Sequence, residues 1–198
     1  MGKKKDTFLN MTLSLIGITL VAGLSLGYVN DLTVGPKAKA KLEKKLNALK
    51  LVLPEFDNSP VEDIQMVKSS VVKDSVEIYP AFHKNSFVGA AVIGSTEKGF
   101  SGLIKIMVGF AANGDMLTIE VLEQKETPGL GTKIKNDSFI DQFRGKNPET
   151  YNLKVKKDGG DVDALTGATI TSRAFGEAAQ LAYEEFEKNK ESLKSLKN

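Results

Sequence analysis

The longest apolar segment of the chain lies near its N-terminus. Residues 7–30 are 24 consecutive uncharged residues between Asp6 and Asp31. As a helix, residues 8–29 would extend roughly 33 Å, which matches the hydrocarbon core of a bilayer at about 30 Å. Tyr28 lies at one end of the run, where an interfacial aromatic side chain is typical. The pattern predicts a membrane-spanning helix.

A cleaved secretory signal is the alternative, because Lys3, Lys4 and Lys5 resemble the basic start of a signal peptide. The apolar run is, however, longer than the usual signal core of about 7–15 residues. No small-x-small cleavage site directly follows it. We therefore expect an uncleaved anchor in residues 1–30 and one further domain in residues 31–198. Lysines flank the run on both sides, so the charges do not decide its orientation.

Beyond the span, helical and strand periodicities follow one another. Gly35-Pro36 is expected to end the link from the membrane and to start a helix. On that helix Ala38, Leu42, Leu46 and Leu49 recur at helical spacing. Short apolar or alternating runs predict strands at residues 71–72, 76–79, 86–93, 99–111, 116–122 and 151–155. Asn113-Gly114 between two of these runs predicts a β-hairpin.

Two further helices complete the pattern. Phe139, Ile140 and Phe143 indicate a short helix. Residues 169–193 carry one apolar stripe at helical spacing, formed by Ala174, Phe175, Ala178, Ala179, Ala182, Tyr183 and Phe186. The predicted fold class is α+β, with an antiparallel or mixed sheet and a C-terminal helix after the membrane span.

Composition limits the chemistry that this chain can perform. It has no Cys and one His, His83, which excludes disulfides, cysteine-ligated metals, a cysteine nucleophile and a multi-histidine site. A net charge of +2 gives no global reason to bind nucleic acid. We predict no metal site and no catalytic residue. Redox or transfer chemistry would need hydroxyls, carboxylates, lysines, backbone groups or a bound cofactor.

Two segments are not explained by core packing. Hydroxyl residues crowd the start of the last helix at Thr166, Thr169, Thr171 and Ser172. They could cap the helix, or the free N–H groups there could bind an anion such as phosphate, with Gly167 and Ala168 allowing close approach. Residues 126–131, Glu-Thr-Pro-Gly-Leu-Gly, could be a simple turn or a loop whose N–H groups lie along a polar ring.

Together these segments resemble a known domain. Residues 163–169, Asp-Ala-Leu-Thr-Gly-Ala-Thr, resemble the flavinylation motif, in which a flavin transferase joins FMN to the last threonine through a phosphoester bond. Residues 125–131 resemble the companion loop of the FMN-binding domain, and residues 99–110 resemble its opening strand. One span followed by this domain resembles the RnfG family of Rnf electron-transport complexes. The NqrC family of sodium-pumping NADH:quinone oxidoreductases is the alternative.

The resemblance implies a set of site residues. Thr169 would carry FMN covalently, and Asp163 would serve the flavin transferase. The residues around Thr169 would shape the bend and lie under the phosphate: Thr166, Gly167, Ala168, Ile170 and Thr171. The loop would lie near the isoalloxazine ring, with Leu130 against the ring face, through Glu126, Thr127, Gly129, Leu130 and Gly131.

The resemblance also implies a place in a larger assembly. The chain would relay electrons within a ferredoxin:NAD oxidoreductase coupled to sodium or proton translocation, without a complete active site of its own. Its partners would be other membrane and peripheral subunits, including another covalent-flavin subunit. The domain would lie on the extracytoplasmic side of the cell inner (cytoplasmic) membrane. An anchored, exported binding or scaffold module without redox function stays open as an alternative.

Overall fold

The computed structural model describes residues 7–69 and 75–197 and divides into two compact units, Met1–Lys44 and Lys45–Asn198. The helix α1 (Phe8–Val52) begins in the first unit and ends in the second. Among the described residues it is the one helix long and apolar enough to cross a membrane. The predicted span at residues 8–29 lies within it. The assignment of residues 1–30 and 31–198 as separate domains stays a prediction.

Several hydroxyl groups within the apolar run bond to the helix itself. Thr12 Oγ1 donates to the Phe8 carbonyl at 2.9 Å, and Ser14 Oγ donates to the Asn10 carbonyl at 2.7 Å. A hydroxyl without a partner would be costly in hydrocarbon, and these bonds to the preceding turn remove that cost. Thr12 and Ser14 are therefore compatible with a lipid environment.

The expected break at Gly35-Pro36 is wrong, because α1 continues through Pro36. Proline removes one backbone hydrogen bond and strains the preceding turn, but it can bend a helix without ending it. Here the residues that follow are mostly Ala, Lys, Leu and Glu, which are strong helix formers. Their combined preference outweighs the loss at a single position.

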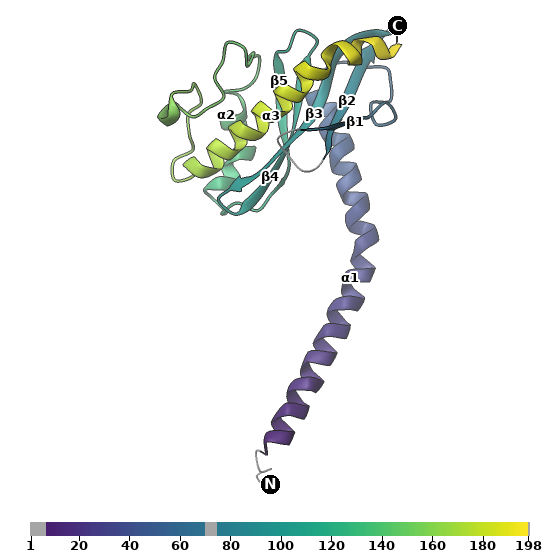
Figure 1. The fold of residues 1–198 in the computed structure, drawn as a ribbon, viewed down its shortest axis with the longest axis vertical. Coiled ribbons are helices and arrows are strands. Elements are labelled where there is room, and N and C mark those ends of the chain that lie inside the picture. Colours follow the sequence, from purple (N-terminus) through teal and green to yellow (C-terminus); the bar gives the residue numbers. More distant parts are fainter. Residues whose placement is uncertain (1–6, 70–74, 198) are drawn as a thin grey trace. The chain divides into compact units, whose positions relative to one another are not determined.

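The second unit is built on a five-stranded antiparallel sheet in the order β1-β2-β3-β4-β5 (Figure 1). Consecutive strands are therefore neighbours throughout. The helices that follow the sheet are the short α2 (Asp137–Ile140) and the long C-terminal α3 (Thr169–Lys194). The strands are β1 (Gln65–Lys68), β2 (Ser75–His83), β3 (Ser86–Gly99), β4 (Gly102–Ala111) and β5 (Met116–Gln124).

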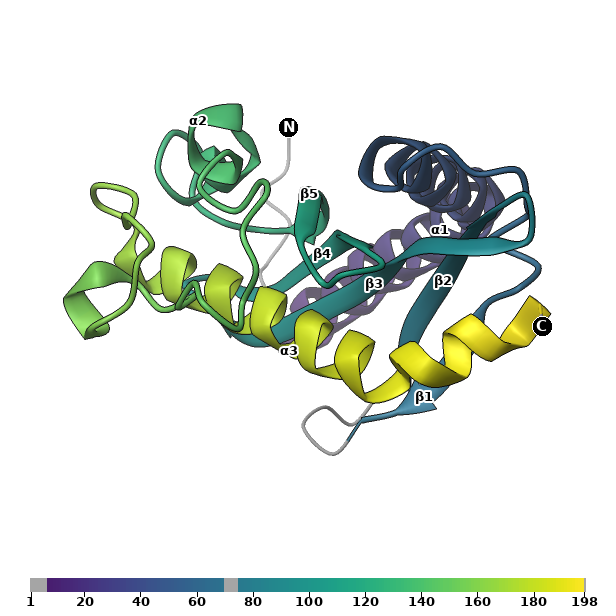
Figure 2. The same cartoon turned by 90° about the horizontal axis from the view of Figure 1, so that it is seen from above.

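Each face of the sheet has its own apolar core. Figure 2 shows α3 running across the strands on one face, where Phe110 stacks on Phe186 with ring centroids 4.9 Å apart. On the other face, Leu49 and Val52 at the end of α1 pack with Tyr79 and Met107. Alternate side chains of a strand point to opposite faces, so the central strands are buried on both sides. The predicted α+β class, antiparallel sheet and C-terminal helix are confirmed.

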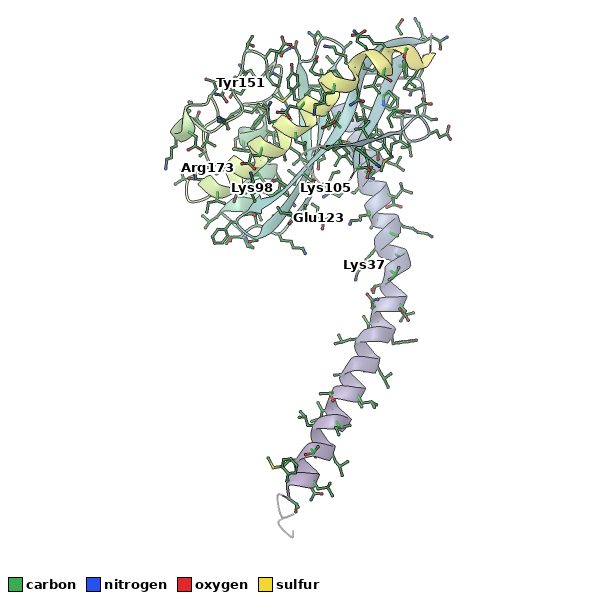
Figure 3. All side chains as sticks on the ribbon, in the orientation of Figure 1. Lys37, Lys98, Lys105, Glu123, Tyr151 and Arg173 are labelled. Carbon is green, nitrogen blue, oxygen red and sulfur yellow. The ribbon has the colours of Figure 1, made fainter. Side chains whose placement is uncertain are left out.

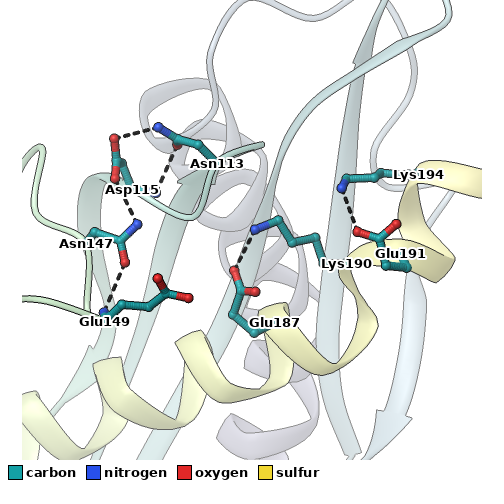
Figure 4. Close-up of polar contacts among 8 residues, drawn as sticks. All are labelled: Asn113, Asp115, Asn147, Glu149, Glu187, Lys190, Glu191 and Lys194. Carbon is teal, nitrogen blue, oxygen red and sulfur yellow. Dashed lines mark hydrogen bonds and ion pairs between the residues drawn. The ribbon is translucent and has the colours of Figure 1, made fainter.

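The predicted β-hairpin is confirmed and is joined to a later loop. Residues 112–115 connect β4 and β5, and Gly114 adopts a φ of 98°. Asp115 accepts hydrogen bonds from the side-chain amides of Asn113 and Asn147, at 2.7 and 3.0 Å (Figure 4). The loop after α2 is thereby fixed to the tip of the hairpin.

Two strand predictions need correction. Gly99 ends β3, and Gly102 begins β4 after a tight turn, so residues 99–111 are not one strand. Residues 151–155 form no strand, and only an isolated bridge joins Val155 to Val162. Their short apolar run instead supplies Leu153 and Val155 to the buried interior. The strand predicted at residues 71–72 lies outside the described residues.

Candidate functional site

The first turn of α3 has no side-chain cap. Ala168 occupies the cap position, and no side chain bonds the N–H groups that follow it. The Thr171 hydroxyl donates to Glu126 instead, and the Ser172 hydroxyl donates to the Ala168 carbonyl. The alternative that these hydroxyls cap the helix is therefore wrong. Among the described residues, no side chain bonds to the N–H groups of the first turn of α3. These groups carry the positive end of the helix dipole.

Thr169 is the first residue of α3, and it follows an exposed turn. Gly167 in that turn has a φ of 77°, a left-handed conformation that favours glycine. A Cβ at Gly167 would lie 3.2 Å from Leu130 Cδ2. The bend before Thr169 is therefore in contact range of the 126–131 loop. The structure brings together the two segments that the sequence motifs had indicated, although they are far apart along the chain.

The 126–131 loop is held by its own hydrogen bonds. The backbone N–H groups of Leu130 and Thr132 donate to the Thr127 carbonyl at 3.2 and 3.3 Å. The Gly129 N–H donates to Thr132 Oγ1 at 3.0 Å, and Gly129 adopts a φ of 77°. This turn leaves Leu130 43% exposed. An apolar side chain is thus presented to the surface by a hydrogen-bonded loop.

Glu126 points into the protein and is only 4% exposed. Its Oε1 accepts from the Ser101 N–H at 3.0 Å, and its Oε2 accepts from the Thr171 hydroxyl at 2.6 Å. Gly131 covers this carboxylate so closely that a Cβ there would lie 2.7 Å from Glu126 Oε2. The structure therefore places Glu126 beneath the loop, and places Thr171 beside Glu126 in the interior.

Asp163 lies at the surface, with its side chain 68% exposed. Its carboxylate accepts from Lys156 Nζ at 2.7 Å, and this hydrogen bond raises the pKa of Lys156 above its usual value. The backbone of Asp163 is held by Gln142, whose amide accepts from the Asp163 N–H and donates to its carbonyl. The motif thus begins on a fixed backbone with an accessible carboxylate.

Ser101 and Gln142 were not expected from the sequence. Ser101 lies in the turn between β3 and β4, where the pattern predicted a continuous strand. Its neighbours Gly99 and Gly102 were the available signal for a tight turn. Gln142 had no such signal, because its bonds to Asp163 join residues that are distant in sequence.

A separate groove of about 760 Å³ runs beside α3. Lys98 and Arg173, which are labelled in Figure 3, are among the residues that line it. Lys98 pairs with Glu177 at 3.0 Å, and Arg173 pairs with Asp158 through two hydrogen bonds of 2.6 and 2.9 Å. None of the site residues expected from the resemblance lines this groove. Its charges are largely compensated within the chain.

Comparisons with known proteins identify the family. A family model described as the FMN-binding domain matches residues 99–184. The chain is 39% identical over 168 residues to the G subunit of the ion-translocating oxidoreductase complex of Cereibacter sphaeroides, covering 81% of this chain and 76% of that protein. The corresponding protein of Aliivibrio fischeri is 34% identical over 197 residues, covering 94% and 93%. This chain belongs to the RnfG family.

The fold of this RnfG family member is similar to that of a protein of known structure. The crystal structure of Shewanella oneidensis NqrC superposes with a TM-score of 0.50 at 20% identity, covering 67% of this chain and 69% of that chain. At this identity the likeness concerns the fold alone. The FMN-binding-domain match begins at Gly99 and ends within α3, so it includes both segments of the site. The resemblance to the RnfG family, stated from the motifs, is confirmed.

Proposed function

We propose that this chain is a membrane-anchored flavoprotein subunit that carries FMN on Thr169 through a phosphoester bond and relays electrons within an Rnf-type complex. The observation that carries the proposal is the position of Thr169. It begins a helix without a side-chain cap, and it follows by two residues the exposed Gly167, where a Cβ would lie 3.2 Å from Leu130 of the 126–131 loop. The fold and family are those of the FMN-binding domain.

The surroundings of Thr169 suit a phosphate. A phosphate esterified on both sides keeps one negative charge, and a helix N-terminus stabilises such a charge by about 0.3–1 kcal/mol. The turn at residues 166–167 is exposed and leaves room for the attached group. Thr166, Gly167 and Ala168 would form the bend that presents the threonine, and Ile170 would lie beside the phosphate.

The 126–131 loop suits an aromatic ring. Leu130 is exposed although it is apolar, and Thr127, Gly129 and Gly131 fix the loop around it. When bound, FMN supplies the electron transfer, for which a chain without Cys or Trp has few groups of its own. The residues of this chain bind and orient the cofactor. A covalent bond prevents its loss during repeated transfers.

The proposed assembly follows from the family. The relatives are subunits of ion-translocating oxidoreductase complexes, and this chain would occupy the same position in such a complex. We propose that α1 crosses the cytoplasmic membrane once, with the FMN-binding domain on the extracytoplasmic side. The complex would couple ferredoxin oxidation and NAD reduction to sodium or proton transport. Its neighbours would include another covalent-flavin subunit, and a flavin transferase would act during maturation.

Attachment is tested by coexpressing the full chain with a flavin transferase and viewing flavin fluorescence in a denaturing gel. The wild-type band should fluoresce. Thr169→Val removes the hydroxyl but keeps the shape of the side chain, so the fluorescence should be lost.

Thr171→Ser is the matched control, because it retains the hydroxyl that donates to Glu126. Its band should fluoresce like the wild type. A fluorescent Thr169→Val band, or a dark wild-type band in the presence of active transferase, contradicts covalent attachment at Thr169.

The NqrC-type subunit of a sodium-pumping NADH:quinone oxidoreductase is the alternative that the motifs leave open. Purification of the native complex distinguishes the two, since the associated subunits would belong to a ferredoxin:NAD or to an NADH:quinone oxidoreductase. The RnfG relatives favour the first outcome.

A further inference from the structure

The Glu126 carboxylate is an unusual group for a loop that faces a ligand. It is 4% exposed, and no Lys or Arg side chain bonds to it within the described structure. Both oxygens are used: one accepts a backbone N–H and the other accepts a hydroxyl. Burying such a group is costly unless its bonds are made, so these bonds fix the segments that make them.

Three segments meet at this carboxylate. Ser101 contributes its backbone N–H from the turn between β3 and β4, and Thr171 contributes its hydroxyl from the first turn of α3. Gly131 comes from the end of the loop and lies against the same group. One side chain therefore holds together parts of the sheet, the loop and the helix.

Each of these three contact residues directly follows an exposed apolar residue. Phe100 precedes Ser101 and is 67% exposed. Leu130 precedes Gly131 and is 43% exposed, and Ile170 precedes Thr171 and is 48% exposed. Since their neighbours bond to or cover one carboxylate, the backbones of these three exposed apolar residues all lie close to it. We call Phe100, Leu130 and Ile170 the apolar rim.

We infer that Glu126 is the positioning residue of the flavin site and that the apolar rim is the surface on which the isoalloxazine ring packs. This inference rests on the proposed attachment of FMN to Thr169. Thr169 directly precedes Ile170, so the tether keeps the ring near the rim. An aromatic ring gains by covering exposed apolar side chains. Phe100 is then a ring-contacting residue outside both sequence motifs.

Glu126 holds Ser101 and Thr171 through its two carboxylate oxygens, which accept their hydrogen bonds. A side chain that can bond to both partners should therefore replace it. In Glu126→Gln, the amide oxygen can accept the Ser101 N–H while the amide nitrogen donates to the Thr171 hydroxyl oxygen. Glu126→Ala leaves both partners without a bond. We therefore expect Gln to keep the rim in place and Ala to release it.

The test uses the flavinylated full chain in detergent and two measurements on the attached flavin. The visible circular dichroism of the flavin reports its fixed asymmetric surroundings, and iodide quenching of its fluorescence reports its exposure. Glu126→Ala should lose the visible circular dichroism and increase the quenching constant, whereas Glu126→Gln should resemble the wild type. An Ala variant that matches the wild type, or a Gln variant as altered as Ala, overturns the positioning role.

Phe100→Ala tests the rim without touching the carboxylate, and it serves if Glu126→Ala does not fold. It should increase iodide quenching while far-ultraviolet circular dichroism shows an unchanged fold. Met66→Ala on β1 is the matched control, because Met66 is 59% exposed and lies on the strand at the other edge from β5. Equal quenching in Phe100→Ala and Met66→Ala overturns the assignment of the rim.

The two proposals fail differently. If the wild-type chain carries no flavin after coexpression with an active flavin transferase, the proposed function fails. If flavin is attached but its circular dichroism and quenching do not respond to Glu126→Ala and Phe100→Ala, only the present inference fails.

Discussion

Two residues of the segment that resembles the flavinylation motif have different surroundings, and the difference suggests different roles. The side chain of Asp163 is largely exposed and pairs with Lys156, while Thr169 is partly buried at the start of α3. An exposed carboxylate contributes little to folding, because solvent screens its ion pair. It is, however, accessible to a second protein. Asp163 is therefore suited to recognition during maturation and Thr169 to the attachment itself.

Asp163→Asn should abolish flavin attachment and leave the fold intact. The substitution removes the charge but keeps the backbone bonds to Gln142. Gel fluorescence after coexpression with the transferase measures attachment, and far-ultraviolet circular dichroism measures the fold. Lys156→Met removes the ion-pair partner and serves as the control, with attachment expected. A fluorescent Asp163→Asn band would show that the transferase does not need this carboxylate.

At the scale of elements, the position of α3 on the sheet depends on glycine. Gly94 in β3 lies under α3 so closely that a Cβ there would overlap the Ala178 carbonyl oxygen. Gly176 on α3 lies similarly close to the Leu153 carbonyl. The Gly94 contact fixes how deeply α3 sits on the sheet, and the Gly176 contact fixes α3 against the segment around Leu153. They thereby fix where its first turn presents Thr169.

Gly94→Ala should destabilise the domain by about 1–3 kcal/mol, the usual cost of an added carbon in a packed interior. Urea unfolding followed by circular dichroism measures the change. Ser95→Ala is the control, because this substitution at a partly buried neighbour removes an atom instead of adding one; its effect should stay within about 0.5 kcal/mol. Equal stability of Gly94→Ala and wild type would contradict close helix–sheet packing at this glycine.

The end of α1 is joined to the sheet by a polar cluster. Lys45 Nζ donates to Glu77 Oε2 at 2.6 Å, and the Tyr79 hydroxyl donates to the same oxygen. Burial alone would raise the pKa of Glu77, but the hydrogen bonds from Lys45 and Tyr79 and the nearby positive charges outweigh it and lower the pKa below 4.5. Burial and the Glu77 charge raise the pKa of Tyr79. The cluster stabilises the folded state while Glu77 is ionised.

The stability that Glu77 adds should therefore depend on pH. A lowered pKa means that the contribution is complete above about pH 4.5, the ordinary value, and is lost as the pH falls through the folded-state value. The difference in unfolding free energy between wild type and Glu77→Gln should be constant near neutral pH and shrink in acid. Urea titrations at a series of pH values measure it. If the difference in unfolding free energy grew as the pH fell, it would contradict a lowered pKa of Glu77.

Local patterns predicted the elements better than their junctions. The apolar stripe of α3 and the Asn113-Gly114 turn are local signals, and both elements formed as predicted. Pro36 misled the prediction because the helix formers around it outweighed one lost bond. The bonds of Glu126 to Ser101 and Thr171 join residues 25 and 45 positions away, which no periodicity encodes. The motifs indicated the two segments of the proposed site, but only the fold shows which carboxylate joins them.

At the scale of the whole molecule, we propose a cofactor domain tied to a membrane by one helix. α1 includes the apolar run and ends against the sheet within the second unit, where Leu49 and Val52 are buried. A tether of this kind confines the domain to one surface of the membrane. The charges on either side of the span do not choose that surface, so it must be measured.

Because the chain has no Cys, a single introduced Cys can report the side of the membrane. Glu62→Cys places a thiol at an exposed position of the domain, and Lys4→Cys places one before the span. In intact spheroplasts, a membrane-impermeant maleimide should label Glu62→Cys, whereas Lys4→Cys should need permeabilisation. The reverse pattern would place the domain in the cytoplasm.

The central claim is that Thr169 carries the cofactor, and mass spectrometry of the native complex tests it most directly. Trypsin would release residues 158–173, which contain the whole hydroxyl-rich segment before and within the first turn of α3. We expect this peptide to be heavier by the mass of FMN less one water, with fragment ions assigning the addition to Thr169. An unmodified peptide, or an addition on another residue, would contradict the claim.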